Sequence, residues 1–342
     1  MTNKRNILLI YTGGTIGMVK DYDTNALKAF NFSQILKNIQ ELKQLNCSIE
    51  TISFDEPIDS SNMNTGYYVK IAEIIEDNYQ KYDGFVVLTG SDTMSYVSSA
   101  LSFMLENLQK PVIFTGSQLP VGYLRTDAKE NLITSIEIAS SYERDKPVVS
   151  EVCLYFEYKL YRANRTTKLS SEQFEAFASM NYPHLAESGV HLQFRKHLLY
   201  KTDCTELIVR KNMVADIVVL KLFPGISKNV LESVLSIPNL KGVILETYGA
   251  GNAPTSQVFI NALAKGVESG IHIVNVTQCT GGSVLMGHYE TSTQLKEIGI
   301  INGKDMTTES AVAKMMYLLG LNLSNNEFIH YYEQSLRGEI SN

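Results

Sequence analysis

The chain has 342 residues, 44% of them hydrophobic and 19% charged, a composition typical of globular rather than disordered proteins. A chain of this length is longer than one ordinary hydrophobic core supports, so we expect a large domain and a smaller one. The formal net charge of −6, with no Lys/Arg cluster, argues against a nucleic-acid partner, because phosphates attract a basic surface.

The cysteines and the apolar segments indicate the compartment. The cysteines show no CxxC spacing, so neither a disulfide framework nor a zinc site is predicted: Cys47, Cys153, Cys204 and Cys279. The apolar run near the N-terminus is too short for a signal peptide, and no segment approaches the ~20 apolar residues of a membrane span. We therefore expect a cytoplasmic protein that does not enter a membrane.

The first two hundred residues repeat one pattern, in which an apolar strand ends in a glycine- or hydroxyl-rich turn. In chain order the predicted strands are 7–11, 49–54, 85–88, 112–114 and 152–156, with helical patterns at 67–82, 94–108 and 129–142. A second block from about residue 213 repeats the pattern in IVVLKLFPG, GVILETYGAGN and IHIVNVTQCTGG. Continuous apolar strands that alternate with helices predict a mainly parallel sheet flanked by helices.

This pattern predicts an α/β protein of two domains. Residues 1–195 are expected to form the larger, N-terminal domain with a mainly parallel sheet and most of the functional site. The polar segment 196–212 is interpreted as a linker. Residues 213–342 are expected to form a smaller C-terminal α/β domain.

Open α/β sheets bind ligands outside the carboxyl ends of their strands, so the polar turns are expected to converge there. They would bring together hydroxyls, carboxylates and an amine: Thr12, Thr15, Asp59, Ser60, Ser61, Ser91, Asp92, Ser117 and Lys168. Such a set suits a small polar molecule. Taken singly, TGGT and TGSDT also fit tight turns with capping residues, but five such strand ends together favour a site.

Several familiar chemistries lack their motifs. TGGTIG has neither the phosphate-loop order nor GxGxxG, the histidines show no HExxH, and no GxSxG elbow is present. A hydroxyl nucleophile without histidine remains, and it needs a neighbouring base. A lysine oriented by a carboxylate can supply that base, which points to Ser91, Asp92 and Lys168, with Thr15 in its glycine-rich turn. Neither a metal nor a cofactor is predicted.

Seven motifs together are similar to those of the bacterial type I (cytoplasmic) L-asparaginases. They span about 7–338 and read YTGGTIGM, DSSNM, TGSDTM, TGSQLP, NRTTK, YGAGNAP and TQCTGG. The resemblance implies hydrolysis of L-asparagine to L-aspartate and ammonia through a threonine acyl-enzyme. It also implies a homodimer or a homotetramer.

The resemblance assigns roles to individual residues. Thr15 would be the nucleophile, and Ser91, Asp92 and Lys168 would form the group that activates it. Substrate binding would fall to Asp59, Ser60, Ser61, Ser117 and Asn252. In that set Asp59, Ser60 and Ser61 hold the α-amino and α-carboxylate groups, the 115–118 turn contributes to an oxyanion hole, and Asn252 reaches in from the neighbouring subunit.

The chain departs from the family pattern in three places. Thr89 and Ser91 replace a His and a Thr, and serine lacks the methyl that restricts χ1, so we expect a slower relay. The loop tyrosine that contacts the nucleophile aligns with Asn25, and Tyr22 is its nearest substitute. Glu246 takes the place of an arginine that binds an allosteric asparagine in some members, so no such activation is expected.

Two alternatives to an asparaginase remain open. The first is a related amidase that acts on glutamine or on another amide. The second is a non-catalytic amide-binding sensor, in which the altered 89–91 segment marks lost chemistry.

Overall fold

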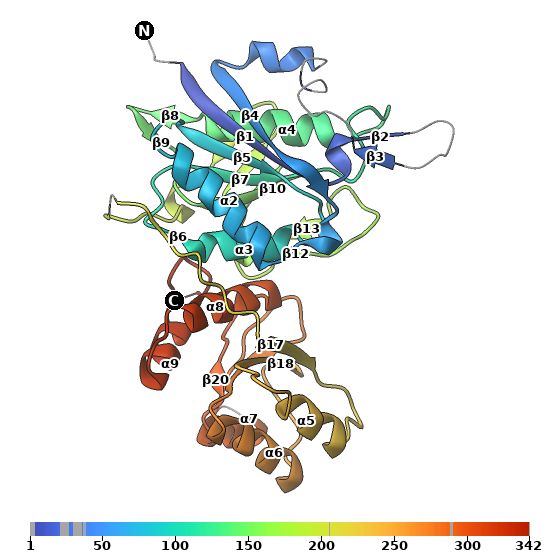
Figure 1. Ribbon diagram of the computed structural model, residues 1–342, viewed down its shortest axis with the longest axis vertical. Coiled ribbons are helices and arrows are strands. Elements are labelled where there is room, and N and C mark those ends of the chain that lie inside the picture. The colour runs from blue at the N-terminus through green and yellow to red at the C-terminus, as the bar shows by residue number, and fades with distance from the viewer. Residues whose placement is uncertain are drawn as a thin grey trace. The chain divides into compact units, whose positions relative to one another are not determined.

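A computed structural model describes residues 4–20, 27–29, 36, 39–204, 206–287 and 290–341 (Figure 1). The chain divides into two compact units. One is formed by Met1–Ser179 and Pro183–Lys211, and the other by Met180–Tyr182 and Asn212–Asn342.

The first unit is built on an eight-stranded sheet in the order β15-β14-β11-β10-β7-β5-β1-β4. Five strands form its parallel part: β1 (Arg5–Gly13), β4 (Cys47–Ile58), β5 (Gly84–Leu88), β7 (Val112–Thr115) and β10 (Val152–Phe156). Three antiparallel strands extend one edge: β11 (Lys159–Arg162), β14 (Ala186–Ser188) and β15 (Leu192–Phe194). The predicted α/β fold with a mainly parallel sheet in the larger unit is confirmed.

Helices cover both faces of this sheet: α2 (Thr65–Asn78), α3 (Met94–Met104) and α4 (Ala128–Ala139) (Figure 1). The ring of Phe85 stacks on Tyr79 just after α2, with centroids 6.1 Å apart. A Cβ on the preceding residue, Gly84, would lie 2.6 Å from the carbonyl oxygen of Ala139 at the end of α4. Neighbouring strand residues point to opposite faces, so α2 and α4 lie on opposite sides of the sheet.

Local sequence explains these elements. All five residues of β5, GFVVL, are buried, as expected for a strand covered on both faces. Helix α2 begins after Asn64, whose side chain accepts a hydrogen bond from the Gly66 N–H. Its buried residues recur at helical spacing: Tyr68, Ile71, Ala72 and Ile75.

Short elements complete the first unit. The short strands pair as β2 (Met18–Lys20) with β3 (Leu27–Ala29), β6 (Leu105–Glu106) with β16 (Ile208–Val209), β8 (Tyr142–Glu143) with β9 (Lys146–Pro147), and β12 (Thr167–Lys168) with β13 (Phe177–Ala178). The 3-10 turns are η1 (Thr15–Gly17), η2 (Gln40–Gln44), η3 (Ser60–Asn62), η4 (Ala163–Arg165) and η5 (Lys196–Leu198). Both η5 and β16 belong to the segment 196–212.

The second unit contains a parallel four-stranded sheet, β17 (Ile217–Lys221), β18 (Gly242–Thr247), β19 (His272–Thr277) and β20 (Ile301–Asn302). Its helices are α5 (Lys228–Leu235), α6 (Gln257–Glu268), α7 (Glu290–Glu297), α8 (Thr308–Gly320) and α9 (Asn325–Glu333). Val243 packs in the core beneath α5 and α6, whereas a Cβ on Gly242 would meet Met315 of α8. Helices therefore cover both faces of this sheet as well.

A buried ion pair fastens the C-terminal segment to α8. The side chains of Lys314 and Glu339 are 0% exposed, and their Nζ and Oε1 atoms are 2.5 Å apart. Lys314 also donates to the carbonyl oxygen of Tyr332 at 2.8 Å. The Glu339 carboxylate accepts backbone N–H groups of Leu336 and Arg337. Each polar atom of these two side chains therefore has a partner.

Within the described parts of the chain, no helix is both long and apolar enough to cross a membrane.

Candidate active site

Four turns of the first unit meet in close contact at the carboxyl ends of its parallel strands. A Cβ on Gly14 would lie 2.5 Å from the backbone nitrogen of Gly90, and one on Gly90 would lie 2.6 Å from Cβ of Ser60. A Cβ on Gly116 would lie 2.4 Å from the carbonyl oxygen of Thr89. Because glycines allow this approach, the turns after β1, β4, β5 and β7 form one surface.

Thr15 begins η1, directly after two glycines with positive φ. The φ angles of Gly13 and Gly14 are 136° and 86°, which residues with a side chain rarely adopt. Thr15 is half-buried, whereas Thr12 is fully buried and donates its hydroxyl to the Leu88 carbonyl oxygen at 3.0 Å. Thr12 therefore ties β1 to β5, and Thr15 is the threonine placed at the surface formed by the turns.

Ser91, Asp92 and Lys168 come together as predicted from the sequence. Lys168 Nζ lies 2.9 Å from Ser91 Oγ and 2.7 Å from Asp92 Oδ1. The lysine comes from β12, which follows the antiparallel strand β11 and the turn η4. The ammonium, the hydroxyl and the carboxylate thus form the hydrogen-bonded group that a histidine-free relay requires.

The segment after β4 presents a carboxylate to solvent. Asp59 is exposed and accepts the Ser61 backbone N–H at 2.9 Å and the Ser61 hydroxyl at 2.7 Å. Hydrogen bonds from the side chain and the backbone of Ser61 hold the pKa of Asp59 below its usual value. Ser60 is buried, and its carbonyl oxygen accepts the Thr93 hydroxyl at 2.9 Å. Asp59 is therefore fixed as an anion beside the surface formed by the turns.

The turn after β7 contains one predicted residue and one that sequence reasoning missed. The Ser117 hydroxyl is buried and donates to the Leu119 carbonyl oxygen at 2.6 Å, so it stabilises its own turn. The next residue, Gln118, accepts a hydrogen bond from Ser91 Oγ at 3.2 Å. Gln118 could have been found from its place in TGSQLP, because this turn follows one of the strands whose ends were expected to form the site.

Thr89 is the residue that the resemblance places where the family motif has a histidine. It is 1% exposed, and its buried hydroxyl has no hydrogen-bond partner in the described structure. The Thr89 backbone is regular, and its N–H donates to the Thr115 carbonyl oxygen at 3.1 Å. This departure therefore leaves the turn intact but leaves one polar atom unsatisfied.

Among the other predicted positions, one belongs to the second unit and the loop positions are not described. Asn252 lies in the second unit, in the turn after β18, where it exchanges backbone hydrogen bonds of 2.8 and 2.9 Å with Tyr248. Tyr22 and Asn25 lie outside the described residues. The described residues contain no group of three or more His, Cys, Asp or Glu side chains suited to a metal ion.

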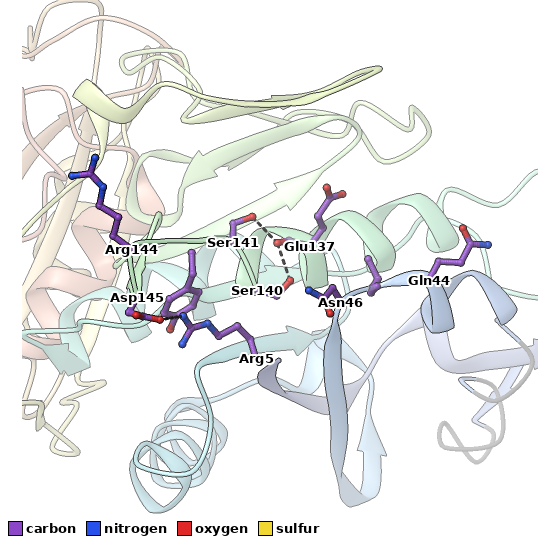
Figure 2. Close-up of a pocket in the computed structure, with 10 residues that line it drawn as sticks. Arg5, Gln44, Asn46, Glu137, Ser140, Ser141, Arg144 and Asp145 are labelled. Carbon is purple, nitrogen blue, oxygen red and sulfur yellow. Dashed lines mark hydrogen bonds and ion pairs between the residues drawn. The ribbon is translucent and has the colours of Figure 1, made fainter. Parts of the chain in front are cut away.

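A polar cleft of about 680 Å³ lies in the same unit but is lined by other residues (Figure 2). Its wall includes Arg5, whose guanidinium lies 2.6 Å from Asp145 Oδ1 and stacks over the Tyr142 ring at 4.1 Å. Arg5 begins β1, whereas the candidate site follows the ends of the strands. This cleft therefore lies at the amino ends of the parallel strands, and none of the predicted site residues lines it.

Comparison with known families decides the identity of this arrangement. Residues 6–200 match the family described as asparaginase, N-terminal, and residues 216–331 match the glutaminase/asparaginase C-terminal domain. The chain belongs to the asparaginase family. The similarity inferred from the sequence motifs is therefore confirmed.

Individual asparaginases are similar over the full length. L-asparaginase 1 of Escherichia coli (strain K12) is 41% identical over 339 residues, which cover 99% of this chain and 98% of that protein. The crystal structure of L-asparaginase I from Vibrio cholerae superimposes with a TM-score of 0.91 at 38% identity, with 99% of each chain covered. The thermostable L-asparaginase of Thermococcus kodakarensis has a TM-score of 0.90 at 30% identity, with coverage of 98% and 99%.

Proposed function

We propose that this protein hydrolyses L-asparagine to L-aspartate and ammonia, with Thr15 as the nucleophile. The observation that carries the proposal is the hydrogen-bonded group of Lys168, Ser91 and Asp92 beside the turn that holds Thr15. The identity to proteins named L-asparaginase supports the choice of substrate.

The chemistry follows from these groups. Thr15 Oγ attacks the carbon of the side-chain amide while its proton passes through Ser91 to Lys168, which takes part in this step as the neutral amine. The C–N bond then breaks, and the departing nitrogen takes up a proton and leaves as ammonia. Water, activated by the same relay, hydrolyses the ester to aspartate and restores the Thr15 hydroxyl.

Substrate binding uses the two exposed carboxylates. Asp59 and the outward side of Asp92 meet the α-ammonium group, and such charge-assisted contacts are the stronger kind. Ser60 and Ser61 hold the α-carboxylate, and backbone N–H groups near Ser91 and in the 115–118 turn stabilise the oxyanion. Losing one donor of this type costs ~10²–10³ in rate.

Ammonia release tests the proposal directly. We expect purified protein to release ammonia from asparagine, and Thr15→Ala to abolish it without loss of the folded state. Thr51→Ala, on a half-buried threonine of β4, is the matched control and should keep full activity. Ammonia release by Thr15→Ala at the wild-type rate would contradict the role of Thr15.

Two other activities are separated by the same assay. The family's C-terminal domain is described as glutaminase/asparaginase, so glutamine should be assayed beside asparagine. Faster release from glutamine would replace the proposed substrate. If the protein binds asparagine but releases no ammonia, and Ser91→Thr restores none, the altered 89–91 segment marks a sensor.

We further propose a cytoplasmic homodimer or homotetramer in which Asn252 completes the site of the neighbouring subunit. Mixing inactive Thr15→Ala and Asn252→Ala proteins tests this arrangement. A mixed dimer then holds one site with both lesions and one intact site, so activity should return on subunit exchange. Subunit exchange shown by differently tagged chains, with no return of activity, would contradict the shared site.

A further inference from the structure

The side-chain amide of Gln118 faces the Ser91 hydroxyl, and its hydrogen bonds allow one orientation. Its Nε2 atom donates to the backbone carbonyl oxygen of Gln173 at 3.0 Å. A carbonyl only accepts, so the NH₂ group must point toward Gln173. The amide oxygen of Gln118 therefore lies on the side of Ser91, 3.2 Å from its Oγ.

The Ser91 hydroxyl lies between two partners of opposite character. Lys168 Nζ lies 2.9 Å away and, in its resting ammonium form, can only donate. The oxygen of Gln118 can only accept. In this form Ser91 Oγ receives a hydrogen bond from Lys168 and donates one to Gln118, and the two contacts together select one rotamer of Ser91. When Lys168 is the neutral amine, the hydroxyl hydrogen can turn toward it while Oγ keeps that rotamer.

A serine at this place needs such a constraint. A β-branched threonine is stiff at χ1, whereas serine can occupy all three staggered wells. Ser91 stands where the family motif has threonine. The orientation of this hydroxyl therefore depends on hydrogen bonds and not on a methyl group.

The backbone of Gln118 is itself anchored in the core. The N–H groups of Gln118 and Leu119 donate to the two carboxylate oxygens of Asp127 at 2.8 and 3.1 Å. Asp127 is 5% exposed, and the buried Asn131 donates to the Gly116 carbonyl oxygen at 3.1 Å. Residues at the start of α4 thus hold the turn in place. The Gln118 side chain therefore starts from a fixed backbone position when it binds Ser91.

We infer that Gln118 is a positioning residue, whose amide holds Ser91 in its active rotamer in place of the missing methyl. This inference rests on the proposed amide hydrolysis. It predicts that Gln118 matters while residue 91 is serine and matters much less once residue 91 is threonine.

Steady-state kinetics of four proteins test this coupling: the wild type, Gln118→Met, Ser91→Thr, and the double variant. Loss of one neutral hydrogen bond predicts that Gln118→Met lowers kcat by about five- to ten-fold, with KM and Tm unchanged. In the Ser91→Thr background the same change should lower kcat by less than about two-fold, because the threonine methyl supplies the constraint. Gln118→Ala serves as a second variant if the methionine impairs folding.

Gln193→Met is the matched control, because Gln193 is an exposed residue of β15 at the edge of the same sheet. It should leave kcat unchanged in both backgrounds. If Gln118→Met lowers kcat equally with serine and with threonine at position 91, the inference is wrong. It is also wrong if the wild type is active and Gln118→Met does not lower kcat. Neither result would affect the proposed function. A wild type that releases no ammonia would instead reject the proposed function.

Discussion

Lys168 Nζ lies 2.7 Å from Asp92 Oδ1, although the two residues are 76 positions apart in the chain. The lysine side chain is 16% exposed and the aspartate side chain 69% exposed. The lysine is therefore largely enclosed by the protein, whereas the aspartate carboxylate is accessible to solvent. Asp92 can orient the amine and also meet a cationic group of a ligand, which is the double role that the proposed reaction needs.

Removing the amine should abolish the relay while leaving binding largely intact. We expect Lys168→Met to lower kcat by ~10²–10⁴, the usual contribution of a positioned acid–base group. Ammonia release at saturating asparagine measures this effect. Lys81→Met, on an exposed lysine of the same unit, should keep the wild-type rate. A Lys168→Met enzyme within two-fold, roughly, of wild type would exclude Lys168 from the chemistry.

The contact between the turns should tolerate no side chain at Gly90. A Cβ there would lie 2.6 Å from both Cβ and Oγ of Ser60, so one turn must move. We expect Gly90→Ala to lower stability by about 1–3 kcal/mol and to reduce activity as well. Gly189→Ala is the control, since a Cβ at Gly189 meets nothing within 4 Å. Equal unfolding midpoints for the two variants would disprove close packing at Gly90.

The buried pair of Lys314 and Glu339 should matter far more than a surface pair. We expect Lys314→Met to lower the free energy of unfolding by about 3–5 kcal/mol, because it leaves the buried Glu339 carboxylate without its cationic partner. Lys228→Met, in the exposed pair with Glu232, should cost less than about 0.5 kcal/mol. The double variant Lys314→Met/Glu339→Gln should recover part of the loss in urea unfolding. No recovery would contradict the pairing.

The same pair predicts how stability depends on acid. Burial favours a higher pKa for Glu339, but the Lys314 charge and the backbone N–H groups of Leu336 and Arg337 outweigh it and lower that pKa. The contribution of the ionised Glu339 to the free energy of unfolding is therefore complete above the unfolded-state pKa of about 4.3. It is lost as the pH falls below that value toward the lower pKa of the folded state. Glu339→Gln should flatten this acid limb of the stability curve. A limb as steep as in wild type would contradict the lowered pKa.

Asparagine saturation should be hyperbolic. The resemblance to the family implies that Glu246 takes the place of an arginine that binds an effector in some members, and the Glu246 carboxylate is already engaged. Its Oε1 accepts the Thr308 hydroxyl at 2.6 Å, and its Oε2 lies 3.6 Å from Lys221 Nζ. The negative charge would also repel an effector carboxylate. Sigmoidal kinetics that Glu246→Ala converts to hyperbolic would refute this expectation.

Much of the first unit could be predicted because local signals agree with the fold. The run at 152–156 predicted a strand with the bounds of β10, and Lys168 of the segment NRTTK was expected to lie with Ser91 and Asp92, where the structure has it. Continuous apolar runs predicted a parallel sheet, since strands buried on both faces leave no polar alternation. Strand ends in such a sheet converge, which explains why the turns after β1, β4, β5 and β7 meet. Lys168 instead reaches Ser91 and Asp92 from β12, after the antiparallel strand β11.

Other features depend on contacts that no local pattern encodes. The antiparallel strands β11, β14 and β15 are short, and the hairpin after β10 depends on positive φ angles at Glu157 and Tyr158. Asn181 makes hydrogen bonds to Gly282 and Asp305, so the segment 180–182 belongs to the second unit, far along the chain. Gln118 is a common polar residue in a loop, and only its distance to Ser91 indicates a role.

We propose that one site, formed by the turn of Thr15, by Asp59 and by Asp92, binds the amino acid whose amide is hydrolysed. A crystal structure of the protein soaked with L-aspartate, the product, tests it most directly. We expect density for aspartate between Thr15, Asp59 and Asp92, with its side-chain carboxylate next to Thr15 Oγ. Well-defined aspartate elsewhere in the crystal, with this place empty, would contradict the site and the mechanism built on it.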